Sequence, residues 1–230
     1  MSTLTQLLSD VKQRCDIENS SHLSDAELTR LINYGYGELY DVLVTKFQDE
    51  HISSATFSTV SGTDTYSLTT DASVTDLYKL KGVDLTFGGE TVTVRRFNFH
   101  ERNIFNSNPA AGSSASYNMR YNLQGDDIVF MPAPTGAHTV KIWYIPQLTV
   151  LSAGGDSVSG QVMINWEEYI VIAAAIRVKE KREEDARALL QERAWLLKRI
   201  EESASDRDAG EAGAIVDVDA GTFGQWGSNF

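Results

Sequence analysis

The sequence predicts an α+β protein: a helical bundle with a long C-terminal helix, an inserted antiparallel β-sandwich or barrel domain, and an extended C-terminal tail. Three observations support this prediction. Apolar residues recur at helical spacing near both ends of the chain, short β-rich runs separated by turn residues fill the middle, and a Gly/Asp-rich stretch with aromatics ends it. The predicted segments are 1–53 (N-terminal helices), 54–160 (β insertion), 161–204 (long helix) and 205–230 (tail).

Two helices are expected before residue 48. The first places four apolar residues on one face: Leu4, Leu7, Leu8 and Val11. Ser24 and Glu27 have the spacing of a capping box, which predicts that a second helix starts there and continues through about Phe47. Gly35 and Gly37 interrupt its apolar pattern at a cost of about 1 kcal/mol each relative to alanine, and such glycines usually permit a close crossing or a bend.

The middle of the chain alternates strand-forming runs with turn residues. Gly88-Gly89 and the Gln124–Asp127 stretch fall between runs where hairpin turns are expected, and Pro132 follows the end of a strand. The runs are Ala55–Val60, Thr65–Leu68, Leu77–Phe87, Thr91–Arg96, Tyr117–Leu123, Ile128–Met131 and Thr139–Ile145.

One uninterrupted helical pattern extends from about Asn165 to Ser203, which would be roughly 60 Å long as a single helix. Its first half, Tyr169–Ile176, is apolar on every side, so we expect it to be buried all round against the N-terminal helices. From Lys179 onward charges dominate, and a stripe of apolar positions remains: Ala186, Leu189, Leu190, Trp195, Leu196, Leu197 and Ile200.

We expect this charged half of the helix to lie between neighbouring subunits. Leu190, Leu197 and Ile200 are the predicted subunit-interface residues. The glutamates that alternate with Lys and Arg along the same segment would then supply salt bridges between identical helices.

The tail carries three large apolar residues separated by glycines and small polar residues. Phe223, Trp226 and Phe230 have the composition of anchors that dock into grooves on a partner surface. They are the predicted partner-binding residues.

Composition and charge indicate where the protein is made and which kinds of ligand and partner are not expected. Cys15 is the single cysteine and the four histidines lack metal-ligand spacing, so no disulfide, metal or cofactor is expected. The N-terminus lacks the pattern of a signal peptide and no apolar run is long enough to span a bilayer, which predicts a protein made in the cytoplasm without a membrane partner. Twenty basic and thirty-two acidic residues give a net charge of −12, which argues against binding nucleic acid by charge and is compatible with DNA that passes without sticking.

No motif predicts catalysis, and no catalytic residue is assigned. The paired carboxylates at Asp126-Asp127, Glu167-Glu168 and Glu183–Asp185 fall in a turn, a helix start and a solvated face, where structural roles are usual. Arg95-Arg96, with Arg102 and Arg120, offers a basic patch that either contacts DNA or pairs with acids. A small hydrolase that uses Asp126, Asp127 and His100 or His138 is an alternative without support from residue spacing.

With these elements in order, the sequence resembles the head-to-tail adaptor (connector) proteins of tailed bacteriophages. The resemblance rests on the N-terminal pattern from Ser24 to Asp41, the entry to the last helix from Ile164 to Ala175, and the charged continuation to Glu202 with its trailing tail. It implies a helical bundle with a β insertion, assembled as a ring, usually of twelve copies, under the portal of a filled capsid.

In such a virion the ring would extend the DNA channel at the head–tail junction. It would offer a docking surface to the next neck or tail protein, while C-terminal segments reach the portal. Another phage neck, tail or baseplate component is the closest alternative.

Overall fold

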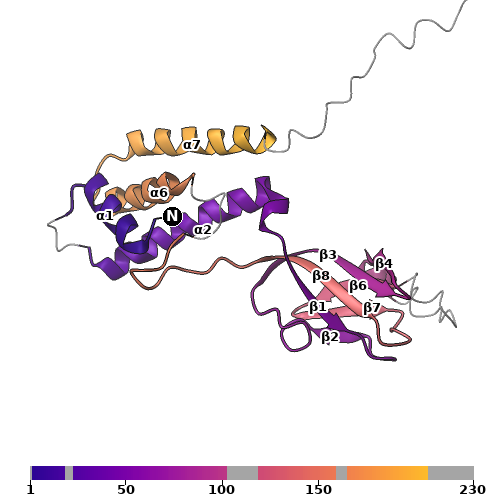
Figure 1. The fold of residues 1–230 in the computed structure, drawn as a ribbon. Helices are drawn as coiled ribbons and strands as arrows, with labels where there is room; N and C mark the ends of the chain where they lie inside the picture. The colour runs from indigo at the N-terminus through magenta and orange to yellow at the C-terminus, as the bar shows by residue number, and fades with distance from the viewer. Residues whose placement is uncertain (1, 19–22, 103–118, 159–164, 207–230) are drawn as a thin grey trace, which may run out of the picture.

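The computed structural model describes residues 2–18, 23–102, 119–158 and 165–206, and Figure 1 shows a bundle of helices beside a β region. The α-helices in these ranges are α1 (Leu4–Arg14), α2 (Asp25–Lys46), α6 (Glu167–Lys181) and α7 (Arg187–Asp206), and short 3₁₀ helices lie at η1 (Gln48–His51) and η2 (Phe99–Glu101). The strands are β1 (Ser53–Ser58), β2 (Thr65–Ser67), β3 (Leu77–Phe87), β4 (Glu90–Thr93), β5 (Arg95–Arg96), β6 (Arg120–Gln124), β7 (Asp127–Met131) and β8 (Thr139–Pro146). The predicted anchors Phe223, Trp226 and Phe230 lie outside the described residues.

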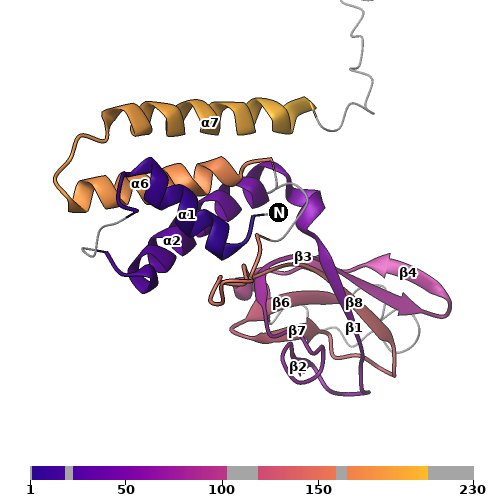
Figure 2. The ribbon, with the colours of Figure 1, turned by 60° about the vertical axis from the view of Figure 1, so that its left-hand side comes forward.

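Helix α6 is the centre of the bundle. It contacts α1, α2 and α7, and of its apolar run Tyr169–Ile176 only Val171 is not fully buried. A helix that is apolar all round needs neighbours on every side, and α6 has them (Figure 2). The predicted packing of this run against the two N-terminal helices is confirmed.

The crossing of α2 over α6 depends on one of the two glycines in α2. A Cβ atom on Gly35 would lie 3.0 Å from the Cβ of Ala173 and 3.1 Å from the carbonyl oxygen of Ile170, so only glycine fits without a shift of its neighbours. A Cβ atom on Gly37 would have no neighbour within 4 Å. The expected close crossing is therefore at Gly35, and the described chain gives Gly37 no such role.

The start of α2 uses half of the expected capping box. The hydroxyl of Ser24 accepts a hydrogen bond from the backbone N–H of Glu27 at 3.2 Å. The carboxylate of Glu27 does not reach back but pairs with Lys181 at the end of α6. This ion pair ties the first turn of one helix to the last turn of another.

The predicted long C-terminal helix is wrong: the segment is a hairpin of two helices, with α7 folded back along α6 (Figure 1). Lys179–Asp185 are seven consecutive charged residues with nothing to bury. Within this run Glu183 adopts a left-handed conformation with φ of 58°. The N–H of Glu183 donates to the carbonyl of Glu180 at 3.1 Å, and the N–H of Glu184 donates to the carbonyl of Lys179 at 2.9 Å. These two bonds form a Schellman cap, which ends α6.

The predicted β insertion is present, and it consists of two four-stranded sheets. Their strand orders are β1-β8-β3-β4 and β2-β7-β6-β5, with all pairs antiparallel except β5 and β6. Side chains from both sheets share one buried cluster, in which the ring of Phe57 lies 5.2 Å from that of Tyr66 and 6.4 Å from that of Phe130. This cluster is separate from the core of the helical bundle.

The run predicted as one strand from Thr91 to Arg96 divides between the two sheets. β4 belongs to the first sheet and β5 to the second, and buried Val94 stands at the change, with its N–H bonded to the carbonyl of Val83 at 2.8 Å. The predicted hairpin turns are confirmed: Gly88, Gly89 and Gly125 all have positive φ, which glycine adopts at little cost.

The bundle and the β region are joined through neighbouring strands. β1 follows the end of α2, β8 leads back to the bundle, and the two pair directly, with Ser53 opposite Tyr144. The hydroxyl of buried Tyr40 on α2 donates to the carbonyl of Pro146, and its ring packs edge-on against His51. The two halves of the molecule therefore meet at Tyr40.

We predict a loss of stability at alkaline pH that depends on Tyr40. Burial, with a smaller effect of Tyr78, raises the pKa of Tyr40 from 10.0 to about 12. Because folding raises this pKa, the contribution of neutral Tyr40 is complete below pH 10 and is lost as the pH rises through 12. Urea unfolding should show that Tyr40→Phe costs about 1 kcal/mol at neutral pH, and that its deficit relative to wild type shrinks at alkaline pH. A deficit that stays constant with pH would contradict the prediction.

The segment after β8 returns along the bundle and closes it against the N-terminus. Asn33 holds this segment by two hydrogen bonds of 2.8 Å, one from its side-chain amide to the carbonyl of Leu151 and one from the N–H of Leu151 to its carbonyl oxygen. Thr3 forms an isolated antiparallel bridge with Ser157, and the N–H of Leu4 bonds the carbonyl of Asp156 at 2.8 Å. The N-terminal residues are thus fixed beside the start of α6.

Candidate assembly interface

The groups that could have carried chemistry occupy structural positions. Asp126 lies in the turn between β6 and β7, and Asp127 is the first residue of β7. The Glu183–Asp185 run lies between α6 and α7, and the ring of His138 packs on Phe87. Within the described residues no group of three or more His, Cys, Asp or Glu side chains is placed to hold a metal ion. In the same ranges no helix is long and apolar enough to cross a membrane.

Three of the four arginines singled out in the sequence lie on β5 and β6 at one edge of the second sheet. Arg95 on β5 stands in register with Arg120 on β6, and Arg96 follows on the same exposed edge. The guanidinium of Arg102 lies 4.4 Å from the ring centre of Phe99, which is itself exposed. Arg95 and Arg120 are therefore neighbours, and contact of this edge with DNA stays a prediction.

The three residues of α7 that the sequence predicted at a subunit interface differ in how far they are buried. Ile200 is fully buried in the core of its own chain, together with Leu189 and Leu196, and Leu197 is half-buried against that core. The expectation for Ile200 is therefore wrong, because folding α7 back on α6 turns this side of the stripe inward. Leu190 remains 45% exposed, so it alone of the three presents a largely free apolar side chain.

The half-buried carboxylate of Glu38 links α7 to α2 and α6. Glu38 of α2 contacts Arg177 of α6 at 2.5 Å through Oε1 and Arg193 of α7 at 3.1 Å through Oε2. The Nε of Arg193 also donates to the hydroxyl of Tyr169 at 3.1 Å. Glu38 thus forms ion pairs with cations from both α6 and α7, and these pairs help to position α7 along α6.

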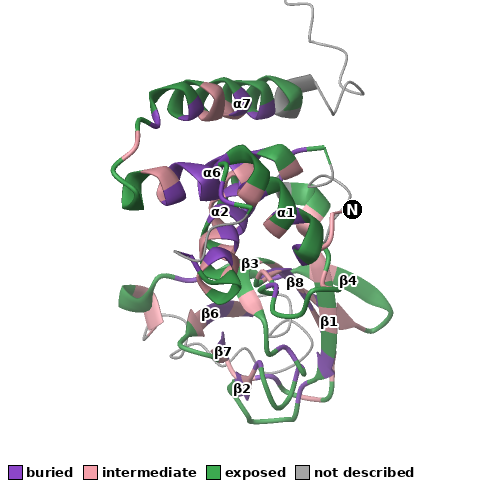
Figure 3. Ribbon diagram, turned by 90° about the vertical axis from the view of Figure 1, so that its left-hand side faces the viewer, coloured by how far each residue is buried: buried purple, intermediate pink, exposed green. Residues whose placement is uncertain are grey.

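The opposite flank of α7 presents an exposed aromatic residue. Trp195 is 56% exposed, and the guanidinium of Arg199 lies 4.7 Å from its ring centre and 5.4 Å from that of buried Trp166. Close by along the helix, Glu192 pairs with Arg14 of α1 and raises the pKa of Arg14 by accepting its hydrogen bond. Figure 3 shows α7 on the outside of the bundle, with an exposed outer face.

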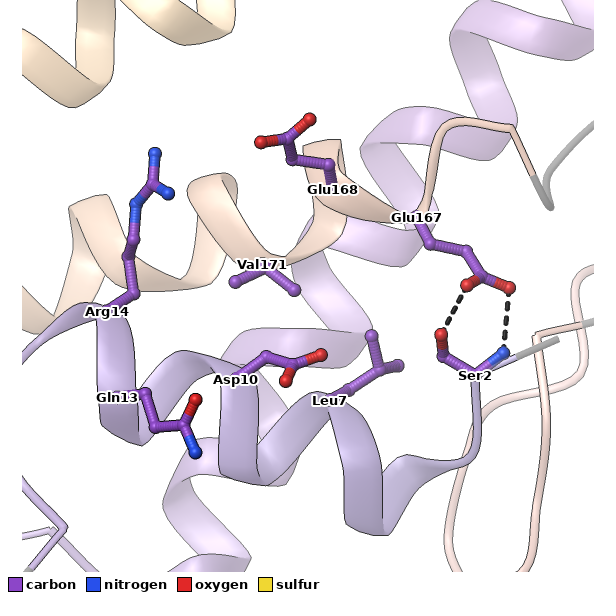
Figure 4. A pocket seen from close by; sticks show the side chains of 8 residues that line it. All are labelled: Ser2, Leu7, Asp10, Gln13, Arg14, Glu167, Glu168 and Val171. Carbon is purple, nitrogen blue, oxygen red and sulfur yellow. Dashed lines mark hydrogen bonds between the residues drawn. The ribbon is translucent and has the colours of Figure 1, made fainter.

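A groove of about 530 Å³ opens between α1 and the start of α6 (Figure 4). Apolar Leu7 and Val171 line it together with three carboxylates, Asp10, Glu167 and Glu168. Glu167 accepts hydrogen bonds from the backbone N–H and the hydroxyl of Ser2. The only cation among the lining residues is Arg14, whose charge is paired with Glu192, so the groove is acidic.

Sequence reasoning missed the groove and the exposure of Trp195. The groove forms only where α1 and α6 meet, and no residue pattern in either helix marks it. One turn before and after it along α7, the neighbours of Trp195 are charged, and Trp195 does not lie on the buried side with Leu189, Leu196 and Ile200. This helical position was a signal of exposure in the sequence.

The described chain therefore combines a helical bundle, an outer helix with two exposed apolar side chains, an open groove between α1 and α6, and an attached β region. The model of the SU10 adaptor protein family matches residues 2–217, and the chain belongs to this family. Its membership confirms the resemblance to phage head-to-tail adaptors and makes the chain an adaptor protein with a structural role in the virion. No curated protein matches the chain.

Proposed function

We propose that the protein forms an oligomeric ring, of twelve copies, below the portal, where it extends the DNA channel and joins the head to the tail. The observation that carries this proposal is the match of the adaptor family over almost the whole chain. The ring would stand at the head–tail junction of the virion, after assembly in the host cytoplasm. Its partners are further copies of the chain, the portal protein and a tail or neck protein.

Two physical features support the proposal. The net charge of −12 repels phosphate groups, so genomic DNA would pass a channel of such subunits without specific binding. Leu190 and Trp195 are exposed apolar side chains on the outer helix, where a neighbouring subunit would contact them. Mass photometry and electron microscopy of the protein with and without the portal test the proposal. Rings that cap the portal support it, and the lack of any complex would reject it.

The C-terminal anchors give this proposal a sharper test. We predict that deletion of the chain after Ala220, which removes Phe223, Trp226 and Phe230, weakens portal binding at least about tenfold, since a few aromatic anchors dominate many interfaces. Replacement of the three aromatics with alanine should have the same effect, and replacement of Gln225, Ser228 and Asn229 should not. Circular dichroism of each variant checks that the fold is kept. Portal binding that survives the deletion would contradict the prediction.

A further inference from the structure

Helix α2 carries an exposed face opposite to its buried one. Arg30, Tyr34 and Gly37 follow one another at four- and three-residue spacing, so they lie along one side of the helix. Tyr34 is 57% exposed, with the guanidinium of Arg177 5.3 Å from its ring centre. Arg30 is exposed, and none of the described acidic side chains forms an ion pair with it.

No contact within the described chain explains why residue 37 is a glycine. A glycine within a helix lowers helix stability, and Gly35, two residues earlier, justifies that cost by its contact with α6. The space above Gly37 is open, since no atom lies within 4 Å of where its Cβ would be. An unsubstituted backbone beside an exposed tyrosine allows another chain to approach α2 closely.

The groove between α1 and α6 is chemically complementary to this face. Its three carboxylates exceed its one cation, and that cation is already paired with α7. Its floor is apolar, because Leu7 and Val171 line it. A side chain with an apolar stem and a cationic end fits such a site, and arginine has both parts.

We propose that the Arg30–Tyr34–Gly37 face of α2 in one copy packs into the α1/α6 groove of a second copy. The guanidinium of Arg30 pairs with the carboxylates of Asp10 and Glu168, and its stem covers Val171. Gly37 lets α1 of the neighbour come close to the α2 backbone. The two surfaces differ, so the contact is heterologous, and repetition of such a contact around an axis closes a ring. The inference rests on the proposed ring and names the contact between its subunits.

Exchange of the paired charges tests this contact. Arg30→Glu and Glu168→Arg should each lower the fraction of chains assembled on the portal about tenfold, because each places like charges together. The double variant should recover most of the assembly, since it restores the pair with its signs reversed. Lys79→Glu, a charge reversal of the same kind at an exposed position of β3, serves as the matched control and should assemble as wild type does.

A change at Gly37 separates assembly from folding. Gly37→Gln places a good helix former in open space, so the monomer should melt at or above the wild-type temperature. The same side chain fills the space needed by the second copy, and assembly should fall about tenfold or more. A variant that melts normally and still assembles would overturn the inference.

The outcomes distinguish this inference from the function on which it rests. Full assembly of both single charge variants, or no recovery in the double variant, would overturn the proposed contact and leave the adaptor ring intact. A wild-type chain that never assembles, with the portal or without it, would overturn both.

Discussion

Ile200→Ala should lower the free energy of unfolding by about 2–5 kcal/mol, the usual cost of a cavity in a packed core. Ile200 is fully buried in the cluster that α7 forms with α1, α2 and α6. Its truncation removes apolar contacts that the surrounding helices cannot fully replace. Urea unfolding followed by circular dichroism measures the change.

Leu190→Ala is the matched control because Leu190 stands on the same helix and is 45% exposed. Its truncation should change the free energy of unfolding by less than about 0.5 kcal/mol, as expected for a surface position. If Leu190 lies at a subunit contact, the same variant should reduce assembly while Ile200→Ala reduces stability. Equal stability losses in the two variants would contradict the packing of α7 described above.

Gly35→Ala and Gly37→Ala should shift stability in opposite directions. At Gly35 the new methyl group meets Ala173 and the backbone of Ile170, so we expect a loss of about 1–3 kcal/mol from overpacking despite the better helix propensity of alanine. At Gly37 the methyl group meets nothing, and the gain in helix propensity should raise the free energy of unfolding by up to about 1 kcal/mol.

The two glycine variants control for each other, because the substitution and the helix are the same. Chemical unfolding of both under identical conditions isolates the effect of the crossing between α2 and α6. A stabilising Gly35→Ala would show that the two helices separate readily, which would contradict the crossing at Ala173.

The strands were predictable from the sequence because they depend on local patterns. Short runs of strand-forming residues place β3, β7 and β8 within a few residues of their observed bounds. Gly88 and Gly89 indicate the hairpin turn between β3 and β4, because glycine adopts a positive φ at little cost. The all-round apolar run of α6 likewise predicted a buried central helix. Each of these depends on residues close together in the sequence.

The break between α6 and α7 was not predictable in the same way. Lys, Glu and Arg are good helix formers, so Lys179–Asp185 reads as a continuous helix, and the position that usually carries glycine in a Schellman cap is held here by Glu183. The break follows from tertiary packing, because only a folded-back α7 can bury Leu196 and Ile200 against the bundle. The candidate interface changed with it, since Ile200 moved from the expected surface to the core.

The place of α6 in the chain has a consequence for the order of folding during synthesis. α1 and α2 leave the ribosome first, but the helix that covers them follows only after the whole β region has been made. The β region needs no such delay, because its buried cluster comes from residues 57–144 alone. We therefore expect the β region to fold first, while the apolar faces of α1 and α2 remain uncovered until α6 has been synthesised. Completion of the helical bundle would then be the late step of folding.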